Sequence, residues 1–142
     1  MNRVDKIAYL AGPYSHRLKR IRERRYSQFT EVSARLLEVG ILNFSPITHC
    51  HNTQSYMEEN DTGFETWRRN DLAFVSRCES VIVLMIPGWD KSYGVSEEVK
   101  FAEKNGIPVY YMHVLSDDLV VTSSPTSTKN PMVSIAGERS TL

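Results

Sequence analysis

Short apolar runs alternate with longer amphipathic segments along the chain, and this alternation predicts strands and helices in turn. Four apolar runs are predicted to form strands: residues 7–11, 41–44, 80–86 and 107–112. Each of the first three is followed within two residues by a proline, which is typical of a strand end. The run at 80–86 is almost entirely apolar, as expected of a central parallel strand that helices cover on both faces.

Apolar residues recur at intervals near 3.6 between residues 18 and 39, and charged residues occupy the opposite face. This pattern predicts a helix that ends at Gly40. Further helices are predicted over residues 95–104 and over residues 64–78, where the core-facing side chains are expected to be Trp67, Leu72, Phe74 and Val75. The polar stretch 47–63 is predicted to be a loop, and loops of this length are often functional.

Strands that alternate with helices predict an α/β fold with right-handed crossovers. We expect a flavodoxin-like, doubly wound, mostly parallel sheet of four or five strands with helices on both faces. The length of 142 residues fits about one domain, which we expect over residues 1–116. Residues 117–142 are rich in serine, threonine and proline. They are predicted to be a C-terminal tail that forms an edge strand, contacts a neighbouring subunit or stays mobile.

The 17 basic and 17 acidic residues give a formal net charge of zero. Bulk nucleic acid and anionic membranes are therefore not expected as partners, because both require an excess of positive charge. The basic cluster at 17–25 is interpreted mainly as a solvated helix face, with RNA binding as the alternative. Two cysteines are too few for a disulfide framework, and no apolar run is long enough to span a bilayer. We also see no signal-peptide pattern, so we expect a cytoplasmic protein.

In open α/β sheets, ligands bind at the carboxyl ends of the strands, near the point where the strand order reverses. Residues 9–16, 45–51 and 87–94 each follow or end a predicted strand, so they are expected to converge there. Free backbone N–H groups at a helix start near Gly94 would suit an anion such as phosphate. Glu98 follows in the same helix and is either a functional group or a solvated carboxylate favoured by the helix dipole.

Three blocks in this order resemble the nucleoside 2-deoxyribosyltransferase-like superfamily. They are Tyr9-Leu-Ala-Gly-Pro13, Trp67-Arg-Arg-Asn-Asp71 and the segment from Ser92 to Ala102 that contains Gly94 and Glu98. The resemblance extends from about Tyr9 to Val109. It implies that Glu98 is the nucleophile, that Asp71 is the active-site aspartate and that Tyr9 is an aromatic residue beside the nucleophile.

The resemblance also implies a homodimer or larger assembly, because the family completes its sites across subunits. The candidate donors to a neighbouring site are Ser123, Ser124 and Asn130. No metal or organic cofactor is implied.

The residue types suit cleavage of an N-glycosidic bond. A carboxylate can capture the oxocarbenium-like centre at the anomeric carbon and form a covalent glycosyl-enzyme. Glu98 must be ionised for this step, and we expect the helix N-terminus to favour ionisation. Asp71 is the candidate that protonates or binds the leaving base. The alternative is a solvated Asp71 paired with a nearby guanidinium group.

Position 92 separates two branches of the superfamily in this resemblance. Transferases of free nucleosides carry aspartate six residues before the nucleophile, whereas the branch that hydrolyses nucleoside 5′-monophosphates carries serine, as this chain does at Ser92. A hydroxyl donates to a phosphate that a carboxylate would repel. Ser15 and Arg17 are similar to the first-loop phosphate contacts of that branch. Asp90 leaves open an acidic contact in a shifted register.

The segment His49-Cys50-His51 raises a zinc hypothesis, but no other Cys/His pair stands at ligand spacing. The two histidines are instead interpreted as pocket residues or as exposed loop residues. Trp89 and Tyr14 are interpreted as stacking groups for a nucleobase or as parts of a packed interface.

We therefore predict an enzyme that hydrolyses the N-glycosidic bond of a nucleoside 5′-monophosphate with retention, releasing the free base and a sugar 5-phosphate. The alternatives are a base-exchanging nucleoside 2-deoxyribosyltransferase and a non-catalytic nucleotide sensor. The predicted catalytic residues are Glu98, Asp71 and Tyr9. The predicted substrate-binding residues are Gly12, Ser15, Arg17, Ser45, His49, His51, Trp89, Ser92 and Gly94.

Overall fold

The computed structural model describes residues 6–58, 64–116 and 118–136. These residues form one six-stranded sheet with the order β2-β1-β3-β4-β5-β6. The strands are β1 (Ala8–Ala11), β2 (Asn43–Phe44), β3 (Ser80–Leu84), β4 (Val109–Val114), β5 (Asp118–Thr122) and β6 (Val133–Ala136). The first four strands run parallel, and β5 and β6 run antiparallel to their neighbours. The mostly parallel, flavodoxin-like sheet is confirmed, with one strand more than the four or five expected.

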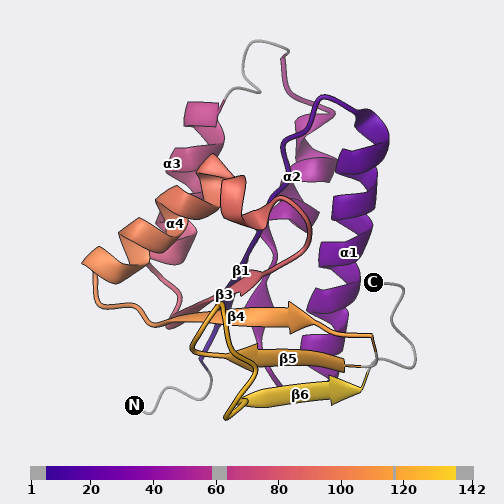
Figure 1. Cartoon of the computed structure of the whole chain (residues 1–142). Helices are drawn as coiled ribbons and strands as arrows, with labels where there is room; N and C mark the ends of the chain where they lie inside the picture. The colour runs from indigo at the N-terminus through magenta and orange to yellow at the C-terminus, as the bar shows by residue number, and fades with distance from the viewer. Residues whose placement is uncertain (1–5, 59–63, 117, 137–142) are drawn as a thin grey trace.

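Helices cover both faces of the sheet, as predicted (Figure 1). One core layer lies between the sheet and the pair α1 (Lys19–Glu38) and α2 (Pro46–Gln54). The other lies between the sheet and the pair α3 (Phe64–Val75) and α4 (Tyr93–Lys104). In the part of the chain that the structure describes, no helix is both long and apolar enough to cross a membrane.

The helix α2 corrects the prediction of a loop from residue 47 onward. Ser45 caps it, because its Oγ accepts a hydrogen bond from the backbone N–H of Thr48 at 3.4 Å. Pro46 occupies the first turn, where its missing N–H costs nothing. Ile47 and Cys50 bury the inner face of the helix, so the polar composition of its outer face hid the helical period. Residues 59–63 of the expected loop lie outside the described residues.

The additional strands come from the segment that follows β4. Leu119 and Val121 of β5 and Ile135 of β6 join the core layer under α1 and α2, and each is at most 6% exposed. Figure 1 shows β4, β5 and β6 side by side at one edge of the sheet. Residues 117 and 137–142 of the predicted tail lie outside the described residues.

The strand order reverses between β1 and β3. From β1 the chain crosses to β2 on one side and then to β3 on the other, and these strands are parallel. Loops that leave the carboxyl ends of β1 and β3 therefore diverge and leave a crevice at this point. The fold thus brings the segments after β1 and β3 to one end of the sheet, as the sequence predicts.

Candidate active site

A cavity of about 1130 Å³ lies at the carboxyl ends of β1 and β3. Its walls come from the loop after β1, the first turns of α1, the inner faces of α2 and α3, and the start of α4. Of the predicted site residues, the cavity is lined by Gly12, Ser15, His51, Asp71, Ser92, Gly94 and Glu98. These residues come from four separate segments of the chain, which the fold gathers around one space.

Glu98 lies on the buried face of α4, in line with Val95 and Ala102, and is only 8% exposed. The helix begins at Tyr93, two residues earlier than predicted, so Glu98 stands in its second turn rather than its first. The hydroxyl of Tyr9, a fully buried residue of β1, donates a short hydrogen bond to Glu98 Oε2. Tyr9 therefore lies beside the candidate nucleophile, where the resemblance implied an aromatic residue.

Burial dominates the electrostatics of this group. It raises the pKa of Glu98 to about 8, the hydrogen bond from Tyr9 opposes the shift, and the charge of Asp71 adds to it. Burial likewise raises the pKa of Tyr9 well above its ordinary value, so Tyr9 remains a neutral donor. We expected the helix N-terminus to favour ionised Glu98; desolvation outweighs that effect, because Glu98 lies beyond the first turn, where the dipole is weaker.

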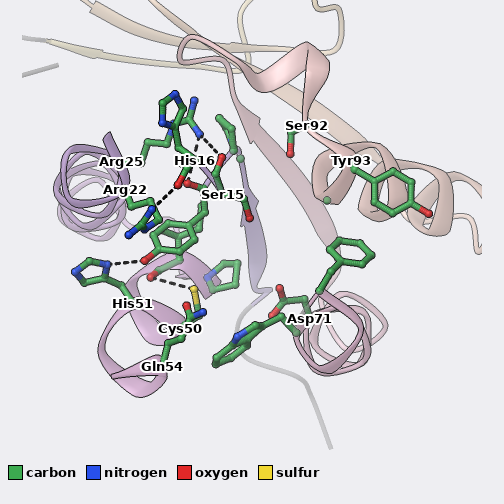
Figure 2. Close-up of a pocket in the computed structure, with 18 of the residues that line it drawn as sticks. Ser15, His16, Arg22, Arg25, Cys50, His51, Gln54, Asp71, Ser92 and Tyr93 are labelled. Atoms are coloured by element: carbon green, nitrogen blue, oxygen red, sulfur yellow. Dashed lines mark hydrogen bonds between the residues drawn. The ribbon is translucent and has the colours of Figure 1, made fainter. Parts of the chain in front are cut away.

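Asp71 projects from α3 into the same cavity (Figure 2). Burial raises the pKa of Asp71 to about 6, and a hydrogen bond from Asn70 partly offsets the shift. Cys50 of α2 also lines the cavity, and burial together with the charges of Asp71 and Glu98 raises the pKa of its thiol to about 12. Cys50 is therefore an unreactive thiol beside two carboxyl groups that both titrate near neutral pH.

The start of α4 supplies hydrogen-bond donors to the cavity. Ser92 is the N-cap, and its Oγ accepts the backbone N–H of Val95 at 3.2 Å. That bond uses a lone pair, so the Ser92 hydroxyl proton is still free to donate. A methyl group built on Gly94 would meet nothing closer than Ser92 Oγ, 3.8 Å away. Gly94 therefore leaves space in the cavity and is not required by the packing of the protein.

Gly12 also has a packing role that was not predicted. A Cβ at this position would lie 1.8 Å from Cζ of Phe29, a fully buried residue of α1. The glycine allows the aromatic ring to pack directly against the backbone at the end of β1. Its presence at the cavity is therefore explained by packing, whether or not it contacts a ligand.

A basic wall, defined here as Ser15, His16, Arg22 and Arg25, faces the start of α4 across the cavity (Figure 2). Arg22 Nη1 donates a short hydrogen bond to the carbonyl oxygen of His16. The Leu18 backbone N–H donates to His16 Nδ1 at 3.0 Å, so a neutral His16 carries its proton on Nε2. Desolvation, and then the charges of nearby arginines, lower the pKa of His16.

The interpretation of residues 17–25 as a solvated helix face was wrong for Arg22 and Arg25. The two residues are three apart on α1, so they share one helix face, and this face borders the cavity. The sequence showed the spacing of the two arginines, but it did not show which face of the helix lies against the loop after β1.

Arg25 ties the two loops of the cavity together. Its Nη1 donates to the carbonyl oxygen of Ser15 at 3.0 Å, and its Nη2 donates to that of Pro87 at 3.1 Å. A Cβ on Gly88 would lie 2.7 Å from this Nη2, and Gly88 also has a φ of +98°, which favours glycine. The loop after β1 and the loop after β3 are thus held in a fixed relation by one guanidinium group.

His51 belongs to an aromatic cluster at one side of the cavity. Tyr14 Oη lies 2.8 Å from His51 Nδ1, and the ring of Tyr26 stacks on the imidazole with centroids 4.2 Å apart. Within the described residues, no group of three or more His, Cys, Asp and Glu side chains is arranged to hold a metal ion.

Four predicted binding residues do not line the cavity: Arg17, Ser45, His49 and Trp89. Arg17 and His49 are exposed, and Ser45 is buried as the cap of α2. Trp89 packs with the core under α4 and contacts the ring of Tyr111 edge-on at 6.0 Å. Each of these residues belongs to the correct segment, but none of the four borders the cavity.

The aromatic lining from α3 and α4 was not predicted. Phe64 and Trp67 line the cavity from the same face of α3 as Asp71, with spacings of seven and four residues. Tyr93 lines it from the first turn of α4. Trp67 had been expected to point to the core; the spacing of three and four residues indicated the shared face, but not that this face borders a cavity.

Comparisons with known proteins agree with this fold. A family model described as a domain of unknown function (DUF1937) matches residues 6–114. The chain is also similar to the solved structure of a 2-deoxyribosyltransferase from the psychrotolerant bacterium Bacillus psychrosaccharolyticus. The TM-score is 0.51 and the sequence identity 22%, over 74% of this chain and 70% of that chain. At this identity the similarity shows a shared fold. No curated protein matches the chain.

Proposed function

The chain belongs to the DUF1937 family, and we propose that it is an enzyme that hydrolyses the N-glycosidic bond of a nucleoside 5′-monophosphate. The observation that carries the proposal is the buried Glu98, hydrogen-bonded by Tyr9, in a cavity that it shares with Asp71 and a wall of basic residues. Burying a carboxyl group without an ion pair is costly, and such groups with perturbed pKa values are concentrated at functional sites.

The proposed reaction has two steps. In the first, a Glu98 carboxylate oxygen bonds to C1′ of the sugar while the bond from C1′ to the base breaks and its electron pair goes to the base nitrogen. Asp71 gives its proton to the departing base. In the second step water attacks C1′, the ester bond to Glu98 breaks, and Asp71 takes up the proton of the water. Two displacements at C1′ give net retention.

The two carboxyl groups differ in a way that suits these roles. The pKa of Asp71, at about 6, lets it hold and release a proton near neutral pH. Glu98, with a pKa of about 8, must be ionised to attack, and its hydrogen bond from Tyr9 favours the ionised form. An ionised carboxylate in this low-dielectric position is poorly solvated, which favours its capture of a positively charged sugar carbon.

The basic wall supports a substrate that carries phosphate. Arg22 donates one hydrogen bond to the backbone oxygen of His16, so its other N–H groups are available to an anion. Ser15 on the basic wall and Ser92 at the start of α4 face the same space and add hydroxyl donors. We propose Arg22 in the role that the sequence suggested for Arg17, which is exposed outside the cavity.

Base exchange is the second candidate function. The solved structure that shares the fold is of a 2-deoxyribosyltransferase, which favours this alternative. The two reactions share the first step and differ in whether water or a second base attacks C1′. In neither is a metal or organic cofactor required, because side chains supply the nucleophile and the proton. The expected homo-oligomer and cytoplasmic location stay predictions.

The proposal is tested by incubating the protein with a panel of nucleoside 5′-monophosphates and the matching nucleosides, with and without an added acceptor base. Chromatography of the released base gives the rate. We expect base release from the 5′-monophosphates without an acceptor, and loss of at least 10³-fold in the Glu98→Gln variant. A free nucleoside as the better substrate would refute the phosphate role, and exchange only with an acceptor would favour the transferase. Tight nucleotide binding without base release would indicate a sensor.

A further inference from the structure

Three aromatic side chains, Phe64, Trp67 and Tyr93, line the cavity on the side formed by α3 and α4. We call them the aromatic wall. Phe64 is 44% and Tyr93 62% exposed, and their rings contact each other with centroids 4.8 Å apart. Large exposed apolar side chains that gather at a cavity indicate a binding surface, because leaving them in water is unfavourable.

We propose that the aromatic wall binds the nucleobase by stacking, which makes Phe64 and Tyr93 specificity-determining residues for the substrate. The inference rests on the proposed function and adds the location and recognition of the base. Its first support is position: Phe64 stands two turns before Asp71 on one face of α3, roughly 10 Å along the helix axis. A base whose glycosidic nitrogen lies at Asp71 would extend along this face.

The second support is the direction of the substrate across the cavity. In a nucleotide, the phosphate and the base leave the sugar from opposite ends, at C5′ and C1′. Figure 2 shows Arg22 and Arg25 on one side of the pocket and Tyr93 on the opposite side. A phosphate between the basic wall and Ser92, with C1′ at Glu98, therefore directs the base past Asp71 toward the aromatic side chains of α3. The ring of Tyr93 contacts Phe64 and completes this surface.

The third support comes from the hydrogen-bonding groups near the aromatic wall. The indole N–H of Trp67 is buried and has no hydrogen-bond partner among the described residues. Arg68, the nearest basic residue on the same helix, is already paired with Glu97 at 3.1 Å. Stacking reads the face of a base rather than its edge, and every base has such a face. Recognition by stacking should therefore tolerate different bases and favour the larger purine ring.

The experiment measures binding by calorimetry in a Glu98→Gln background, where no turnover disturbs the titration. The probes are adenosine 5′-monophosphate, uridine 5′-monophosphate and ribose 5-phosphate, which lacks a base. We expect the adenine nucleotide to bind more tightly than the uridine nucleotide, and both more tightly than ribose 5-phosphate. Phe64→Ala and Tyr93→Ala should each weaken adenine nucleotide binding roughly 10-fold and leave ribose 5-phosphate binding unchanged.

Tyr56→Ala is the matched control, because Tyr56 is a 93% exposed aromatic residue that does not line the cavity. It should change no affinity. Quenching of indole fluorescence by the adenine nucleotide, lost in Trp67→Phe, provides an independent readout. Equal affinity for all three probes, or equal losses for nucleotide and ribose 5-phosphate in the variants, would overturn the inference. A change in oligomeric state without a change in affinity would also overturn it, since the wall would then bind a second copy of the chain.

The binding experiment can fail independently of the proposed hydrolysis. If the unmodified protein released no base but the binding pattern held, the hydrolysis would be refuted and the stacking retained. If base were released while the wall variants behaved like Tyr56→Ala, the reaction would stand and the base would be bound elsewhere.

Discussion

Burial and ionisation oppose each other at Glu98. The side chain is 8% exposed, and the lost hydration raises its pKa to about 8, so the resting site holds a proton that must leave before attack. The hydroxyl of Tyr9 lowers the free-energy cost of ionising Glu98, because it donates a hydrogen bond to the carboxylate. Reactivity at neutral pH therefore depends on a minor ionised population that is poorly solvated.

The pH dependence of kcat/KM follows from these two carboxyl groups. The reactive form has Glu98 ionised and Asp71 protonated, with pKa values of about 8 and 6. Below pH 6 the rate should fall because the ionised fraction of Glu98 shrinks, and above pH 8 because Asp71 has lost its proton. We expect a bell-shaped profile of kcat/KM against pH with limbs near pH 6 and 8. The two limbs report apparent pKa values of the coupled pair of carboxyl groups. Initial rates of base release from pH 4.5 to 9.5 measure it.

Tyr9→Phe checks the assignment of the limbs. Removing the donor should raise the pKa of Glu98 further, moving the high-pH limb upward and lowering the maximum. A rate that climbs steadily to pH 9.5, or limbs that do not move in this variant, would contradict the roles given to the two groups.

Glu98 should also lower the stability of the protein as the pH rises. The folded state binds one more proton than the unfolded state between about pH 4.5 and pH 8, so the free energy of unfolding falls with rising pH across that window. Glu98→Gln removes the penalty and should stabilise the protein by on the order of a few kcal/mol at pH 9, but hardly at pH 4.

Thermal unfolding of both proteins at pH 4, 7 and 9 measures this difference. Glu103→Gln is the control, because Glu103 is an exposed carboxylate on the same helix. A Glu98→Gln variant that is less stable than the parent at pH 9 would show that the carboxylate is held by interactions that compensate for its burial.

Among the helices and strands, hydrophobic periodicity predicted the elements that bury an apolar face. The helix α1 and the strands β1 and β3 were predictable because one face or both faces of each are apolar. The helix α2 was not, because its outer face is polar and only the cap at Ser45 and Pro46 indicated its start. Strand ends differ by one or two residues, since hydrogen bonding to neighbours sets them.

The candidate site was predictable where its residues follow strand ends or belong to a motif that resembles a known family. Glu98, Asp71 and Ser92 were predicted from such a resemblance of three ordered sequence blocks, and all three line the cavity. Arg22 and Phe64 were not, because a helix presents several faces and only tertiary packing selects the one that borders the cavity. His49 and Trp89 were predicted to bind substrate because their segments reach the site, but neither side chain lines the cavity.

The contact between β1 and α1 depends on the absence of a side chain at Gly12. Gly12→Ala would place a methyl group 1.8 Å from Phe29 Cζ and should destabilise the protein by about 3 kcal/mol. Adding Phe29→Leu should recover part of this loss, which a double-mutant cycle in urea detects. Gly94→Ala is the control, since its methyl group meets no atom within 3.4 Å. Additive effects at positions 12 and 29 would show that the backbone shifts to absorb the clash.

For the whole molecule, the sheet continues past β4 into β5 and β6. Leu119, Val121 and Ile135 close the core layer under α1 and α2, and each is at most 6% exposed. A chain cut after residue 116 would expose this layer, so we expect it to lack cooperative thermal unfolding. A chain cut after residue 136 should unfold cooperatively. Cooperative unfolding of residues 1–116 alone would show that the domain ends where the composition changes.

The zero net charge of the molecule conceals the charged groups of the cavity. Arg22 and Arg25 of α1 lie across the cavity from Asp71 of α3, and charged residues of the opposite sign, Glu23 and Lys91, also line it. A substrate with an anionic phosphate at one end and a sugar carbon that becomes positive at the other matches this arrangement. The composition alone gave no reason to expect bulk nucleic acid, and it could not reveal how charges are distributed around the cavity.

We propose above all that Glu98 bonds to the sugar carbon during turnover. Intact-protein mass spectrometry after acid quenching of the reaction with a cleaved nucleotide, followed by peptide mapping, detects this bond. We expect an added mass equal to the sugar 5-phosphate moiety, located on the peptide that contains Glu98 and absent from Glu98→Gln. A residue other than Glu98 carrying the sugar, or base release with full activity in Glu98→Gln, would contradict it.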